Sequence, residues 1–271
     1  NIVRKFNPGV FGGSWSKPPA TCTPALNCSQ LNVAVSGAVS RGIPGQMADM
    51  VVKMQEYHDE GRMDIENDWK LVTILIGGNN LCRYCAAPEM NSPETYVSQI
   101  REAVDQVRED LGRVLVQVQA MFDVTPIGDM EADAEEYPEF CQNMHQVACS
   151  CALDPENELR HIQMEYWRLL DEWINVEAPY DQDEDFAVVL QPQLRDLRPE
   201  YVDGKMDMSY FAPDCFHPSR KTHQLTALSL WNTMLTPVPE KPFNTSLAVV
   251  PDIKCPTEEN PYIFTRGNSG L

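Results

Sequence analysis

The stretch Trp69-Lys-Leu-Val-Thr-Ile-Leu-Ile76, with Gly77-Gly78 directly behind it, indicates the fold class. Its residues are apolar almost without interruption, which is typical of a strand covered on both faces, as the strands of parallel sheets are. The two glycines end the strand and indicate a tight turn at its carboxyl end. We therefore expect this stretch to be a buried strand of a parallel sheet.

Strands and helices alternate on either side of this stretch. Further apolar runs predict strands at residues 31–36, 113–121 and 186–190. Apolar residues at helical spacing predict helices at about residues 44–60, 93–111, 155–176 and 223–234. This alternation is typical of an α/β fold, a parallel sheet with helices on both faces. We expect one such domain over residues 1–235 and an irregular tail over residues 236–271 packed on it.

The charge balance excludes several classes of protein. The chain carries 21 Lys and Arg against 40 Asp and Glu, a net charge of −19. A nucleic-acid binder needs a basic face, and so does a protein held electrostatically on an anionic membrane. The chain is 43% hydrophobic and 23% charged, which is typical of a globular protein. No apolar run is long enough to span a bilayer.

The chain contains nine cysteines, many for a protein of a reducing compartment. They are Cys22, Cys28, Cys82, Cys85, Cys141, Cys149, Cys151, Cys215 and Cys255. The pairs at residues 82–85 and 149–151 could together supply four zinc ligands. We favour disulfides in a secreted or lumenal protein, because glycosylation sequons occur at Asn27 and Asn244. Since nine is odd, at least one cysteine lacks a partner within this chain.

Three candidate sites follow predicted strands or lie on a loop that returns to the same sheet edge, where α/β sheets bind ligands. Gly37 follows the first strand, and its N–H could face a ligand unobstructed. Asn79 could donate its amide N–H to developing negative charge. Asp214 and His217 can form a pair in which the carboxylate orients the imidazole. Taken singly, each has a simpler explanation: a turn glycine, an Asn-rich turn and a chance Asp-x-x-His.

Other residues whose side chains could take part in catalysis or metal binding are interpreted as structural or solvent-exposed. The remaining histidines lack a carboxylate at such spacing and are expected on polar helix surfaces or loops; they are His58, His145, His161 and His223. The acidic run at residues 181–185 lacks the pattern of a calcium loop and is interpreted as a solvated face. We expect no metal and no other cofactor.

Taken together, the order of the three sites resembles the SGNH (GDSL-type) lipase and esterase superfamily, with its block-two glycine, block-three Gly-x-Asn-Asp and block-five Asp-x-x-His. Wider stretches resemble its membrane-associated phospholipase B branch. They are Phe6-Asn-Pro8, Asn32-Val-Ala-Val-Ser-Gly37, Asp68-Trp-Lys70, Ile76-Gly-Gly-Asn-Asn-Leu-Cys-Arg-Tyr-Cys85, Phe211-Ala-Pro-Asp-Cys-Phe-His-Pro-Ser219 and Leu230-Trp-Asn-Thr-Met-Leu-Thr-Pro-Val238. The resemblance extends to about Cys255.

The resemblance implies a serine ester hydrolase that acts by acyl transfer on phospholipids and lysophospholipids. Gly37 and Asn79 would then be oxyanion-hole donors. His217 would be the general base and acid, and Asp214 would orient it. Asn80 stands where the family usually has an aspartate that supports the loop.

The family's Gly-Asp-Ser block, which holds the nucleophile, is absent from the sequence. In this branch it precedes the Phe-Asn-Pro segment and would lie before Asn1. Gly13-Ser14-Trp15-Ser16 follows no strand and is not a convincing substitute. The first residues also lack the apolar core of a signal peptide, so we expect the numbering to start inside a longer precursor.

The resemblance also predicts an incomplete sheet. In the flavodoxin-like strand order 2-1-3-4-5, the absent first strand is central and would lie between residues 31–36 and 71–76. We expect an upstream segment or a clipped companion chain to carry that strand and the serine. The alternative is a non-catalytic extracellular structural or lipid-binding protein that keeps the fold without the nucleophile.

Overall fold

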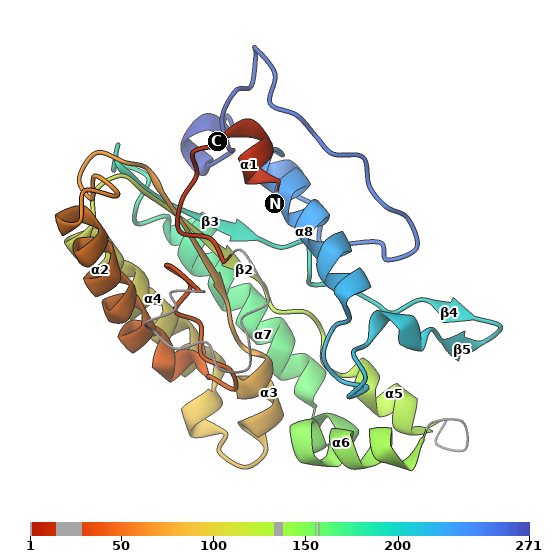
Figure 1. Ribbon diagram of the computed structural model, residues 1–271. Coiled ribbons are helices and arrows are strands. Elements are labelled where there is room, and N and C mark those ends of the chain that lie inside the picture. Colours follow the sequence, from red (N-terminus) through yellow and green to blue (C-terminus); the bar gives the residue numbers. More distant parts are fainter. Residues whose placement is uncertain (1, 15–28, 133–137, 155, 157) are drawn as a thin grey trace.

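The computed structural model describes the chain except for residues 1, 15–28, 133–137, 155 and 157 (Figure 1). Its α-helices are α1 (Val3–Phe6), α2 (Ile43–Asp59), α3 (Gly78–Tyr84), α4 (Pro93–Asp110), α5 (Pro126–Ala132), α6 (Glu139–Cys149), α7 (Leu159–Asp171) and α8 (Arg220–Met234). A π-helical segment, η6 (Glu172–Glu177), extends α7. Short 3₁₀ turns are η2 (Ser40–Gly42), η3 (Glu89–Asn91), η4 (Ser150–Leu153), η7 (Met208–Tyr210), η8 (Val238–Glu240) and η9 (Arg266–Asn268).

The main sheet has three parallel strands in the order β1-β2-β3. They are β1 (Lys70–Leu75), β2 (Val114–Gln119) and β3 (Phe186–Gln191). Continuous apolar sequence correctly predicted all three, because side chains on both faces of β2 and β3 are covered. The α/β, SGNH-type fold class is confirmed. A small antiparallel ribbon, β4 (Tyr201–Val202) and β5 (Lys205–Met206), projects beyond the sheet (Figure 1).

Helices lie on both sides of the sheet. On one face α2 and α4 contribute Met50, Ile100 and Val104 to a core that also includes Val72 of β1 and Val116 of β2. On the other side lies α8, the long blue helix in Figure 1. The expected start of α4 is confirmed, since the Ser92 hydroxyl caps it by accepting a hydrogen bond from the Thr95 N–H at 3.2 Å.

The strand expected at residues 31–36 is not formed. These residues run as an irregular segment, and Val35 is 61% exposed. An apolar run becomes a strand only where a neighbour takes its backbone hydrogen bonds. Among the described residues no strand lies between this segment and β1, whose Leu71 and Leu75 are 41% and 46% exposed. The sheet therefore ends at β1 on this side.

Residues 236–271 contain only short 3₁₀ turns and lie along α8 and the neighbouring strand end. The Trp231 indole N–H donates to the Lys254 carbonyl at 2.8 Å, and the Phe264 N–H donates to the Met234 carbonyl at 2.9 Å. In the part of the chain that the structure describes, no helix has both the length and the apolar character needed to cross a bilayer.

Lys241 is a cation buried under α8. Its ammonium donates to the Thr233 carbonyl at 2.5 Å and to Gln191 Oε1 at 3.4 Å. Burial, with a smaller contribution from the charge of Lys254, lowers the pKa of Lys241 from 10.5 to about 7. A lysine with this pKa is close to half protonated at neutral pH.

Stability should therefore rise with pH. Below pH 7 Lys241 is protonated in both the folded and unfolded states, and above pH 10.5 it is protonated in neither. Between these values only the unfolded state holds the proton, so the free energy of unfolding should increase, by on the order of 3 kcal/mol. Lys241→Met should flatten this rise in denaturant titrations at pH 7 to 10, whereas Lys5→Met, at an exposed site, should leave it intact. An unchanged slope in Lys241→Met would contradict the assignment.

Candidate active site

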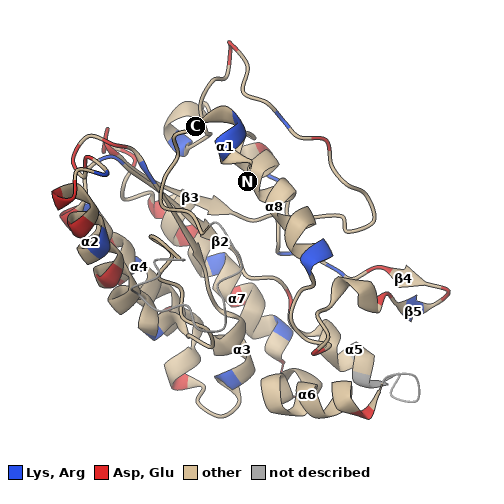
Figure 2. Cartoon of the chain, in the orientation of Figure 1, with Lys and Arg blue, Asp and Glu red and all other residues tan. Residues whose placement is uncertain are grey.

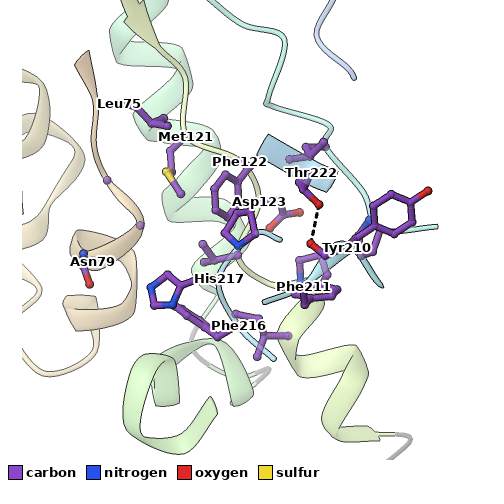
Figure 3. Close-up of a pocket in the computed structure, with 18 of the residues that line it drawn as sticks. Leu75, Asn79, Met121, Phe122, Asp123, Tyr210, Phe211, Phe216, His217 and Thr222 are labelled. Atoms are coloured by element: carbon purple, nitrogen blue, oxygen red, sulfur yellow. Dashed lines mark hydrogen bonds between the residues drawn. The ribbon is translucent and has the colours of Figure 1, made fainter. Parts of the chain in front are cut away.

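An apolar cavity of about 240 Å³ opens at the carboxyl ends of β1 and β2 (Figure 3). Phe122, Phe211 and Phe216 form much of its wall, and Asn79 and His217 lie in the same lining. Parallel sheets place ligands at this edge. The fold thus brings the Asn79 amide and the His217 imidazole, which are far apart in the sequence, to one apolar cavity.

Asp214 holds His217 in a defined orientation. The His217 Nδ1–H donates to Asp214 Oδ2 at 2.7 Å, so the expected hydrogen bond is present and Nε2 remains as the proton acceptor. Asp214 Oδ1 also accepts the backbone N–H groups of Phe216 at 3.1 Å and His217 at 2.9 Å. Partial burial raises the pKa of the Asp214 carboxyl, but these hydrogen bonds outweigh it and the pKa lies below its usual value.

The loop that carries this pair is closed on itself and tied to α6. The Ala212 N–H donates to the His217 carbonyl at 2.7 Å. Cys215, between the two site residues, forms a disulfide with Cys141, and its carbonyl is hydrogen-bonded to His145 Nε2 at 2.9 Å. His145 is buried, not on a polar helix surface as the sequence suggested, and its role is structural.

Asn79 stands in the first turn of α3, not in an Asn-rich turn. Gly77 precedes it with φ +129°, and a side chain there would meet the Tyr96 ring at 3.2 Å. A side chain on Gly78 would meet the Met121 methyl at 3.0 Å. The two glycines therefore let the chain leave β1 and start α3 close to these side chains, which brings Asn79 to the cavity.

Gly37 and Asn80 do not line the cavity. Gly37 has φ +75°, in the left-handed region that glycine tolerates, and its carbonyl accepts from Arg83 at 3.4 Å. Asn80 is buried and supports the neighbouring loop. It accepts the Ser40 N–H at 2.9 Å and donates to the Ser40 hydroxyl at 2.8 Å and to Asn91 Oδ1 at 3.1 Å.

Among the described residues around the cavity there is no serine. The Thr222 hydroxyl donates to the Tyr210 carbonyl at 2.6 Å and is not a free nucleophile. Ser14 donates to the Ser29 carbonyl and lies elsewhere. The site thus contains a carboxylate hydrogen-bonded to an imidazole, and a side-chain amide in the same lining. The aromatic wall was not predicted from the sequence, although Phe211 precedes the Asp-x-x-His motif and Phe216 lies within it.

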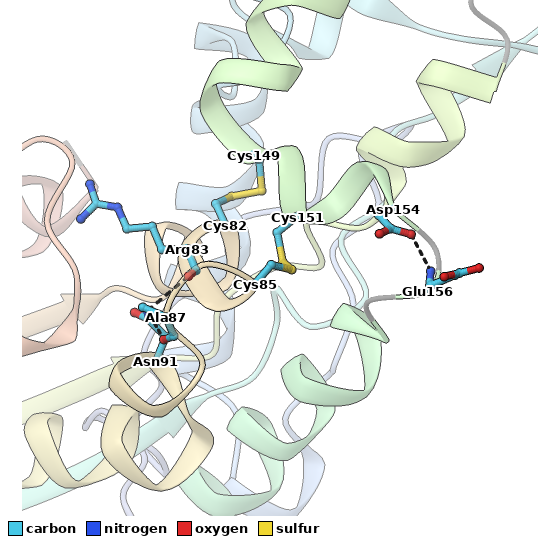
Figure 4. Close-up of a disulfide and its surroundings, with 9 residues drawn as sticks. All are labelled: Cys82, Arg83, Cys85, Ala87, Asn91, Cys149, Cys151, Asp154 and Glu156. Atoms are coloured by element: carbon cyan, nitrogen blue, oxygen red, sulfur yellow. Dashed lines mark hydrogen bonds between the residues drawn. A yellow bond between two sulfur atoms is a disulfide. The ribbon is translucent and has the colours of Figure 1, made fainter.

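Six of the described cysteines form disulfides, which confirms the favoured disulfide interpretation over the zinc alternative. Cys82 is bonded to Cys149 and Cys85 to Cys151 (Figure 4). Cys141 is bonded to Cys215. The described residues contain no cluster suited to a metal ion. Cys255 is exposed and unpaired in this part of the chain. Cys22, Cys28 and the sequon at Asn27 lie outside the described residues. Asn244, in the other sequon, is exposed.

Fold and site together define a class: an α/β protein with a hydrogen-bonded aspartate–histidine pair and an asparagine at an apolar cavity on the carboxyl edge of its sheet. Residues 19–230 match the family model described as GDSL-like Lipase/Acylhydrolase, and the chain belongs to that family. The SGNH resemblance drawn from the motifs is confirmed.

The chain is also similar to curated relatives of the expected branch. It is 35% identical over 285 residues to "Phospholipase B1, membrane-associated" of Homo sapiens, 35% over 279 residues to that of Rattus norvegicus and 34% over 282 residues to that of Mus musculus. Each match covers 100% of this chain and 18% of the relative, so the chain spans less than a fifth of their length. No solved structure matches.

Proposed function

We propose that this chain belongs to a carboxylic ester hydrolase acting on the acyl esters of phospholipids and lysophospholipids. The observation that carries the proposal is the Asp214–His217 pair at 2.7 Å beside an apolar cavity that also holds Asn79. The relatives named phospholipase B1 support the substrate class. The cavity suits an acyl chain, because its wall is rich in phenylalanine.

The chemistry would be acyl transfer through a serine. The serine oxygen attacks the ester carbonyl carbon while its proton passes to His217 Nε2, and Asn79 stabilises the oxyanion. The bond from carbon to the alcohol oxygen then breaks, and His217 protonates the departing alkoxide. Water attacks the acyl-serine, His217 takes its proton and returns one to serine, and a fatty acid leaves.

The nucleophile would come from a segment outside these 271 residues that pairs with β1. The outer edge of β1 has no strand beside it among the described residues. Next to it a groove of about 790 Å³ runs between Leu71 and Thr73 of β1 and the apolar side of α8. An unpaired edge of this kind accepts another strand readily. A strand that pairs with β1 in parallel would end at the carboxyl edge of the sheet, near His217 and Asn79.

We also propose an extracellular or lumenal location and carbohydrate on Asn244 or Asn27. Three disulfides support an oxidising compartment. The exposure of Asn244 makes that sequon accessible. No nucleic-acid partner is expected for a chain with charge −19.

The test is reaction with an alkyl fluorophosphonate, which labels activated serines. The protein should be expressed with the sequence that its gene encodes ahead of Asn1, and the labelled peptide identified by mass spectrometry. We expect one labelled serine in that preceding segment, with labelling suppressed by lysophospholipid and accompanied by fatty-acid release. Absence of both labelling and hydrolysis in the folded protein would favour the non-catalytic alternative.

A further inference from the structure

α6 presents a stripe of apolar side chains to solvent. Phe140 is 56% exposed and Val147 is 84% exposed, with the half-buried Met144 between them. Their spacing of four and three residues places all three on one face of the helix. Single exposed apolar residues are common on protein surfaces, but a contiguous stripe of them on one helix marks an interaction site.

The opposite side of α6 is covalently fixed. Cys141, His145 and Cys149 are buried. Cys141 forms a disulfide with Cys215, and Cys149 forms one with Cys82, which is drawn in Figure 4. The helix cannot rotate its apolar stripe inward without breaking these bonds. The stripe is therefore a permanent feature of the surface.

The position of α6 connects the stripe to the candidate active site. Its disulfide partner Cys215 directly precedes Phe216 and His217, which line the cavity. On the other side, α5 supplies Pro126 and Ile127 to the same lining and lies next to α6 in Figure 1. A surface that contacts the α6 stripe would thus lie close to the cavity.

Charge distinguishes this surface from the rest of the molecule. The chain has a net charge of −19, yet α6 contains a single charged residue, Glu139, at its amino end. Figure 2 shows α6 almost entirely uncharged, whereas α2 carries several acidic side chains. An uncharged apolar patch on an acidic protein fits a surface without net negative charge.

We propose that the Phe140–Met144–Val147 face of α6 docks the protein on a zwitterionic lipid surface and brings the cavity to its substrate. The proposal rests on the proposed function, since phospholipids reside in bilayers and micelles that a hydrolase must reach. Aromatic and aliphatic side chains enter the boundary between headgroups and acyl chains, as on interfacial helices. Anionic lipid would repel the protein, because its own charge is negative.

The test is sedimentation of the purified protein with phosphatidylcholine vesicles at low salt without calcium. Phe140→Ser combined with Val147→Ser should lower the vesicle partition coefficient by about 10- to 100-fold, the expected loss for two inserted apolar side chains. The matched control is Val52→Ser with Val176→Ser, at sites that are 58% and 73% exposed on α2 and η6. It changes no charge and should leave partition unchanged.

A second measurement separates this inference from the proposed function. Binding of a short-chain lysophosphatidylcholine below its micellar concentration reports on the cavity alone, and the α6 variant should retain it. If the wild-type protein does not bind this soluble lysophospholipid, that result would count against the proposed function. Full vesicle partition by the α6 variant, or stronger binding to phosphatidylserine vesicles, would overturn the docking surface. The docking proposal would also be overturned if the wild-type protein does not bind vesicles and instead binds another protein through α6.

Discussion

Replacing His217 by alanine, in the protein that also carries its serine, should lower kcat/KM for ester hydrolysis by about 10⁴-fold. Without the imidazole, nothing at the site takes the serine proton during attack or returns one to the leaving alcohol. The cavity and Asn79 would remain, so a residual rate above the uncatalysed one should persist. The measurement is fatty-acid release from a soluble lysophospholipid, followed with enzyme at known active-site concentration.

Two further variants make this result specific. His223→Ala removes an exposed histidine from α8, six residues along the chain, and should change kcat/KM less than about twofold. Asp214→Asn retains the side-chain shape but loses the charge and the acceptor that orients His217 Nδ1, so its loss should approach that of His217→Ala. Equal rates in His217→Ala and His223→Ala would refute the assigned role of His217.

The sheet was predictable because its signal is local. Residues 114–119 and 186–191 are short apolar runs, as burial on both faces demands. Residues 70–75 carry the same signal, but only one face of this strand is buried, contrary to the expectation of a strand covered on both faces. Residues 31–36 carry the same signal but form no strand, because a strand also needs a neighbour and the described residues provide none. The apolar pattern shows that a segment can form a strand. Whether it does depends on a neighbouring strand, which only the folded structure reveals.

The short helices were missed for a different reason. α3, α5 and α6 are 7, 7 and 11 residues long, too short for a clear periodic pattern. α6 is held instead by disulfides to Cys82 and Cys215, which lie 67 and 74 residues away. Such pairings cannot be deduced from spacing, so the sequence predicted disulfides but not which cysteines pair.

In the candidate site too, local features could be predicted from the sequence and long-range contacts could not. The Asp214–His217 pair could be found because both residues lie on one loop, three positions apart. The contact of Cys215 with His145 spans 70 residues and has no local signature. The aromatic wall likewise joins Phe122, after β2, to Phe211 and Phe216 from a loop almost a hundred residues later.

Removing the Cys141–Cys215 disulfide by a double alanine substitution should both destabilise the protein and impair the site. The bond closes a loop with a sequence separation of 74, so its loss should cost about 4 kcal/mol in the free energy of unfolding. Cys215 lies between Asp214 and Phe216, and its release would let the His217 loop move. Misplacement of a reacting group by about 1 Å can cost about 10²-fold, so we expect kcat/KM to fall by that order beyond any loss of folded protein.

The Cys85–Cys151 disulfide is a matched control, because its sequence separation is 66 and its loss should cost nearly the same stability. It joins the end of α3 to η4 (Figure 4), and neither of its cysteines belongs to the loop that carries His217. Denaturant titrations should therefore show similar losses for both double variants, whereas kcat/KM at a temperature where both are folded should fall only in the Cys141/Cys215 variant. Equal activities would mean that the loop's own hydrogen bonds, from Ala212 to His217 and from Phe216 to Asp214, are sufficient to hold the base. Unequal activities would assign α6 a direct part in positioning it.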